Sequence, residues 1–168
     1  MNKLLKKQNK FYAKNLNNFN VVIKDAKQVS YTFDYEYNCM SYALGRFTEW
    51  GRLNGFHNTY SKDQEIAMSR MEKVFADCCC ELEEIYGCRR ISYSGTFVEQ
   101  NERIIAFRIG FDDFHFARLN SDGVWTHKPG RTHIREMSIE ELFDAEGWSK
   151  KERCHPYTSP IAFFAVQI

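Results

Sequence analysis

The chain has 168 residues, 43% of them hydrophobic and 15% aromatic, which is enough apolar material for one domain with a sizeable core. Its net charge of +1 lacks the basic excess typical of a nucleic-acid-binding domain, and no apolar run is long enough to cross a bilayer. No secretory signal is visible near the N-terminus. We therefore expect one domain over residues 1–168, with 1–20 either a short amphipathic helix or loose. We expect it in the cytoplasm, or released without a cleaved signal peptide.

The first half of the chain predicts mostly helix. Apolar residues recur at helical spacing in two stretches, each followed by a glycine that would end the helix. The expected elements are a short strand at 21–23, a helix from Cys39 to about Trp50 closed by Gly51, a polar loop at 52–62, and a long helix at 63–86 with Ser61 as its N-cap and Gly87 at its end.

The second half changes to the period of strands, with turn residues between them. The expected elements are strands at 91–98, 103–109, 114–119 and 124–127, a helix at 138–145 opened by a Ser138–Glu141 capping box, and a last strand at 161–166. Helices followed by an antiparallel meander predict an α+β domain, with helices packed on an antiparallel sheet.

Cys39 lies where the first main helix should begin, directly after Asn38, a residue type suited to capping a helix. The helix N-terminus and a nearby imidazolium are the two influences that lower the pKa of a thiol. His115, in the strand at 114–119, can supply the second if that strand packs against the helix start. This combination predicts a thiol nucleophile with an imidazole as its base.

His127 follows His115 across the turn at residues 120–123, and positions 115 and 127 are equally far from residue 121. The two rings are therefore expected to face each other across a hairpin. His127 would then bond the far nitrogen of His115, the role of the third group in a triad. Three other polar residues compete for that role, namely Asp112, Asp113 and Asn120.

The run 37–45 around Cys39 and the runs 114–118 and 122–130 resemble papain-like cysteine hydrolases, in particular the NlpC/P60- and CHAP-like branch of bacterial and phage enzymes. Cys39, His115 and His127 match, in chain order, the nucleophile, the base and the polar third residue of that branch. The Asp-Cys-Ser opening of NlpC/P60 is Asn38-Cys39-Met40 here, and the oxyanion glutamine of papain has no clear counterpart.

The resemblance implies a cysteine-dependent hydrolase of amide bonds, acting on a peptide, peptidoglycan or protein as a peptidase, an amidase or endopeptidase, or a deamidase. It requires no metal, cofactor, nucleic acid or membrane. The substrate cleft and oxyanion hole would involve Asn38, Tyr35, Tyr37 and Trp125, beside the backbone N–H of Cys39. The alternative is a non-enzymatic binding or inhibitor protein on the same scaffold. The oligomeric state is left open.

The six cysteines are expected as reduced thiols, because three are adjacent and cannot easily bridge one another. A zinc site is the weaker alternative, since paired Cys-x2-Cys spacing is absent. Its candidate ligands would be Cys78, Cys79, Cys80, Cys88, Cys154 and His155. Three basic residues near the histidines are expected on the solvated surface, with contact to an acidic group of the substrate as the alternative, namely Arg118, Lys128 and Arg131.

Overall fold

The computed structural model describes residues 37–47, 50–57, 62–93, 98–99, 101–130, 133–144, 148 and 157–167. Several expected features lie outside these residues: the segment 1–20, the strand at 21–23, Tyr35, Ser61, Arg131, Cys154 and His155.

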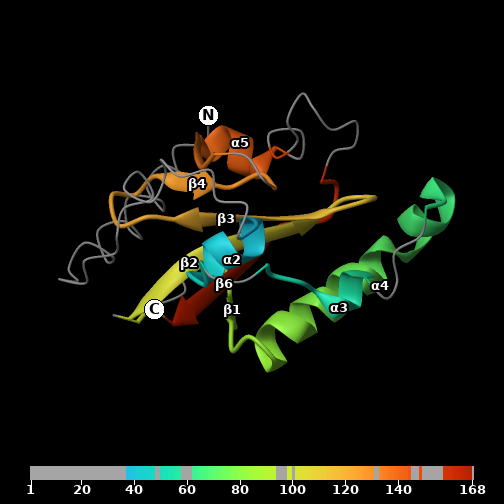
Figure 1. Cartoon of the computed structure of the whole chain (residues 1–168), viewed down its shortest axis with the longest axis horizontal. Coiled ribbons are helices and arrows are strands. Elements are labelled where there is room, and N and C mark those ends of the chain that lie inside the picture. Colours follow the sequence, from blue (N-terminus) through green and yellow to red (C-terminus); the bar gives the residue numbers. More distant parts are fainter. Residues whose placement is uncertain are drawn as a thin grey trace.

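An antiparallel sheet of six strands, in the order β1-β6-β2-β3-β4-β5, forms the centre of the described fold (Figure 1). The C-terminal strand therefore lies between β1 and β2. The strands are β1 (Arg89–Ile91), β2 (Glu102–Ile109), β3 (Phe114–Leu119), β4 (Trp125–His127), β5 (Arg135–Met137) and β6 (Ala162–Gln167). With the helices described below, the sheet confirms the α+β class.

Four expected strands, which correspond to β2, β3, β4 and β6, are confirmed to within one residue at each end. The expected strand at 91–98 is wrong in its bounds, because β1 ends at Ile91. The edge strand β5 was not predicted. Only Met137 is buried in it, so its three residues carry no alternation that a sequence pattern could reveal.

The helices are α2 (Cys39–Leu44), α3 (Asn54–His57), α4 (Gln64–Glu84) and α5 (Ile139–Phe143). The expectation that the first helix runs to about Trp50 is wrong, because Gly45 adopts a left-handed φ of 76° and caps it six residues after its start. The expected polar loop at 52–62 contains the short helix α3. Asp63 caps α4, and α5 opens with the predicted capping box.

Gly51 packs against the start of α2 instead of ending it. A Cβ placed on Gly51 would lie 2.8 Å from the Cβ of Met40, closer than real side chains approach. The Gly51 N–H donates to the Ser41 hydroxyl at 2.7 Å, and its carbonyl accepts from the Asn38 amide at 2.7 Å. The glycine is thus required by a close approach of two backbone segments.

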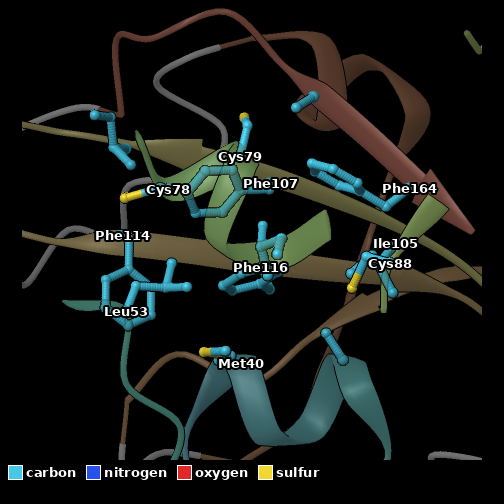
Figure 2. Packing of buried hydrophobic residues seen from close by; sticks show 14 of the residues in the cluster. Met40, Leu53, Cys78, Cys79, Cys88, Ile105, Phe107, Phe114, Phe116 and Phe164 are labelled. Carbon is cyan, nitrogen blue, oxygen red and sulfur yellow. The ribbon is translucent and has the colours of Figure 1, made fainter. Parts of the chain in front are cut away.

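Each face of the sheet carries a hydrophobic cluster. On one face α2, α3 and α4 cover the strands, and Met40, Cys78 and Phe116 are among the side chains that meet there (Figure 2). On the other face α5 packs through Leu142 with Trp125 and Trp148. Alternation along each strand therefore decides which cluster a residue joins.

The first turns of α4 extend beyond the sheet (Figure 1), and the helix becomes buried only from Val74 onward. Ile66 and Met68, in these turns, are exposed. In the part of the chain that the structure describes, no helix combines the length and hydropathy needed to span a membrane.

Glu81 joins α4 to α3 through three hydrogen bonds. Its buried carboxylate accepts from the Asn54 backbone N–H at 2.9 Å, the Asn54 side-chain amide at 3.2 Å and the Gly55 N–H at 2.8 Å. A Cβ on Gly55 would lie 3.1 Å from the backbone of Asp77, so the two helices approach closely. The carboxylate caps a helix that is too short to be stable alone.

We predict that E81A lowers the free energy of unfolding by about 2–4 kcal/mol, because two backbone N–H groups lose a charged acceptor. Urea denaturation measures the change. Glu84→Ala, an exposed position in the last turn of the same helix, is the matched control and should change the free energy by less than about 0.5 kcal/mol. Equal effects of the two substitutions would contradict the role given to Glu81.

Candidate functional site

The start of α2 is fixed by the Asn38 side chain. Its Oδ1 accepts from the Ser41 N–H at 3.2 Å, which is an N-cap bond, and its Nδ2 donates to the Gly51 carbonyl at 2.7 Å. Asn38 is buried, and both ends of its amide are engaged in these contacts. Asn38, which was expected to line the cleft, therefore positions the helix that carries Cys39.

The Cys39 sulfur lies against the backbone of β3. Its Sγ is 3.7 Å from the Phe114 carbonyl oxygen, and the backbone of Phe116 also hydrogen-bonds to it. Because strand N–H and C=O groups point sideways in the plane of the sheet, the sulfur lies beside the edge of β3 and not over its face. β4 pairs with β3 only from Ala117 onward, which leaves this edge available.

His115 and His127 meet at this end of β3. The His115 Nε2 is 2.8 Å from the His127 Nδ1, and both rings are buried. The expected register is wrong by two residues, because His127 pairs with Ala117 and not with His115. A shift of two keeps the face of the sheet unchanged, so the rings become diagonal neighbours that still touch.

The His115 ring lies on the face of the sheet away from α2. It packs against Tyr157, with ring centroids 5.5 Å apart, and against Trp148 at 5.9 Å. Phe114 and Phe116, its neighbours along the strand, lie in the cluster that α2 covers. Cys39 also belongs to that cluster, so the sulfur and the His115 ring approach β3 from different faces.

The surroundings of the Cys39 thiol favour its protonated form. Burial, with a smaller contribution from the negative charge of Asp113, raises the pKa of Cys39 to about 12. Hydrogen bonds from the backbone of Phe116 and Met40, together with the positive charge of Lys128, act in the opposite direction. The pKa-lowering influence expected of an imidazolium is absent from this set of described interactions.

The other candidate residues occupy different places. Asn120 donates to Thr126 and accepts from Arg118 on the α2 side of the sheet, so it does not orient His115. Trp125 is buried in the opposite cluster with Phe163, at a centroid distance of 6.2 Å. Asp112 is exposed. Tyr37 is buried directly before the cap of α2, with its ring 4.8 Å from the Lys128 ammonium.

Three contributors to the site were not identified from the sequence. Lys128 was expected on the surface and is only 2% exposed. Tyr157 donates to Asp113 Oδ2 at 2.9 Å while its ring packs on His115. Arg108 pairs directly with His115 across β2 and β3, and donates to the Tyr157 carbonyl at 3.2 Å. Of these three residues, only Lys128 could have been linked to the site from the sequence, because it is adjacent to His127.

The cysteines of α4 lie apart from this site. Cys78 and Cys79 are buried in the core, and Cys80 is exposed, as the helical geometry predicts. Cys88 is a buried free thiol. Within the described ranges, no three His, Cys, Asp or Glu side chains gather in a way that could hold a metal ion.

The fold and this site together define an α+β domain that presents a buried thiol beside a bonded pair of histidines. The chain belongs to the family described as "Domain of unknown function (DUF7689)", whose model matches residues 28–147. That match includes Cys39, His115 and His127. No curated protein and no solved structure matches the chain.

We predict that the Cys39 thiol makes the protein less stable at alkaline pH. The pKa of Cys39 in the folded state is raised to about 12 from an ordinary value of 9.0. The contribution of the protonated thiol to stability is therefore complete below pH 9.0 and is lost as the pH rises toward about 12. Between neutral pH and pH ~10.5, the free energy of unfolding should fall about 1–2 kcal/mol further in the wild type than in C39S.

Urea denaturation of both proteins at each pH measures this difference, and the other titrating groups cancel in the comparison. C80A is the control, because it removes an exposed thiol while the Cys39 contribution is retained. Parallel pH profiles for wild type and C39S would show that Cys39 ionises normally in the folded state.

Proposed function

We propose that this protein is a cysteine-dependent hydrolase of amide bonds, in which Cys39 is the nucleophile, His115 the base and acid, and His127 the residue that orients His115. The observation that carries the proposal is the position of the Cys39 sulfur. Its two partners on β3 are the carbonyl of Phe114 and the backbone of Phe116, the residues directly before and after His115. The nucleophile candidate is thus held at the residue that bears the base.

The bonded imidazoles support the division of roles. Since the His115 Nε2 is taken by the His127 Nδ1, the Nδ1 of His115 is the nitrogen that must serve the thiol. The proposed proton transfer requires the His115 Nδ1 to approach the sulfur at the edge of β3. A third group that bonds one ring nitrogen fixes the tautomer of the imidazole, and so determines whether the other nitrogen can accept a proton.

The reaction then proceeds by acyl transfer. His115 takes the thiol proton as the sulfur attacks the amide carbonyl, and the backbone N–H of Cys39 is the donor assigned to the resulting oxyanion. His115 returns the proton to the leaving amine as the C–N bond breaks, which leaves a thioester on Cys39. Water, deprotonated by His115, hydrolyses the thioester and restores the thiol.

The proposal extends to the fold and the substrate class. A thiol on the first helix, with histidines on two consecutive strands of an antiparallel sheet, supports a papain-like domain of the NlpC/P60 or CHAP type. The bond cleaved would belong to a peptide, peptidoglycan or protein, and a side-chain amide is included. The residues assigned to the chemistry require no metal or cofactor.

A second candidate, a non-enzymatic binding or inhibitor protein, is favoured by one observation. Cys39, His115 and His127 are each 5% exposed or less, and burial holds the thiol in its protonated form. A protein that uses these side chains only for packing would keep them buried. Hydrolysis assays distinguish the two functions, because they differ in whether Cys39 turns over substrate.

We predict that the wild type releases amine or ammonia from one of three substrates: mixed fluorogenic peptides, purified peptidoglycan fragments, or a denatured protein rich in glutamine. C39A should abolish turnover, because no other group forms the thioester. H115A should lower the rate by about 10²–10⁴-fold, the usual contribution of a general base. H127A should lower it less, since His127 acts through His115.

C88A is the control, because it removes a buried thiol that lies outside the site, and it should retain wild-type rates. The urea midpoint of each variant shows that it remains folded. Turnover that survives in C39A would refute the catalytic assignment. A wild type that cleaves none of the three substrates, with Cys39 resistant to a peptidyl chloromethyl ketone, would favour the binding protein.

A further inference from the structure

We propose that Lys128 and Asp113 are positioning residues of opposite charge that flank the Cys39 thiol and set how readily it gives up its proton. The catalytic meaning of this inference rests on the proposed hydrolase function. The charge arrangement itself is a property of the folded chain and can be measured without turnover.

Lys128 reaches the thiol from the side of β4. It directly follows His127, and its ammonium lies 4.8 Å from the centre of the Tyr37 ring and donates to the Gly130 carbonyl at 2.8 Å. Tyr37 immediately precedes Asn38, the cap of the helix that Cys39 begins. The contact with Tyr37 therefore places a buried positive charge at the N-terminal end of α2, where it favours the thiolate.

Asp113 reaches the thiol from the side of β3. It directly precedes Phe114, whose carbonyl oxygen is 3.7 Å from the Cys39 Sγ. The Tyr157 hydroxyl donates to Asp113 Oδ2 at 2.9 Å, and Arg108 holds the Tyr157 backbone through a 3.2 Å bond to its carbonyl. The carboxylate is thus anchored at a fixed place, where its negative charge disfavours the thiolate.

The two charges act on one sulfur in opposite directions. Because Cys39 and Lys128 are both buried, little solvent is present to screen the effect of the ammonium. Other titratable or charged groups border this end of β3 among the residues that the structure describes, namely His115, His127, Tyr157, His57, Arg108 and Tyr37. Asp113 adds to the effect of burial in disfavouring the thiolate, and Lys128 stabilises the thiolate once His115 has taken the proton.

The test is the rate at which iodoacetamide labels Cys39 in the folded full-length chain between pH ~7 and ~10. Mass spectrometry of the Cys39 peptide gives this rate, and exposed Cys80 in the same samples is the internal reference. K128M should slow labelling about three- to tenfold, and D113N should accelerate it by a similar factor, equivalent to about half to one pH unit in opposite directions.

Two further variants separate charge from structure. K128R keeps the charge and should follow the wild-type profile, while the double variant D113N/K128M should return close to it because the two effects cancel. K73M, at an exposed lysine of α4, is the matched control and should change nothing. If K128M does not fold, D113N decides the question alone.

Unchanged rates in D113N and K128M, or changes in the same direction, would overturn the inference. So would a double variant that labels as slowly as K128M. Each of these results differs from a failure of the proposed function, which would appear as absent hydrolysis with the labelling profiles still shifted in opposite directions.

Discussion

The site depends on the shortness of β4. Its three residues pair with β3 only as far as Ala117, so the edge of β3 at residues 114–116 is left for the Cys39 sulfur. The sequence that ends β4 explains this, since Pro129 lacks an N–H for a ladder and Gly130 adopts a φ of 51°. A β4 longer by two residues would place its backbone where the sulfur now lies.

The helix that carries Cys39 owes its place to tertiary contacts. Six residues are too few for a stable isolated helix, and all six are buried. Asn38 fixes its first turn, the Tyr42 hydroxyl is 2.7 Å from the Thr126 hydroxyl, and the Arg118 guanidinium lies over the Tyr42 ring at 4.1 Å. Because both ends of α2 are anchored to the sheet, the position of the sulfur follows from the packing of the whole domain.

Sequence patterns predicted the parts of this arrangement that are local. The alternation of β2 and β3, the Ser138 capping box and the identity of the two histidines that meet were all visible in short windows. The end of α2 was predicted wrongly, because Gly45 serves as its cap while Gly51 is a backbone contact. The bounds of β1 were also predicted wrongly. The burial of Lys128 depends on Tyr37, far away in the chain, so no local pattern could reveal it.

The alternation of β3 also explains why the thiol and the imidazole meet the strand from different faces. Odd and even residues of the strand face different clusters, so His115 shares a face with Ala117, while α2 covers Phe114 and Phe116. Only a group at the strand edge is accessible from both faces, and the sulfur occupies that position. In the proposed reaction the His115 ring, which packs against Tyr157, has to approach the sulfur at this edge. Hydrogen bonds with Arg108 and Asp113 hold Tyr157 in place, which limits how far the neighbouring His115 ring can turn. These contacts are therefore part of the geometry of the proposed reaction.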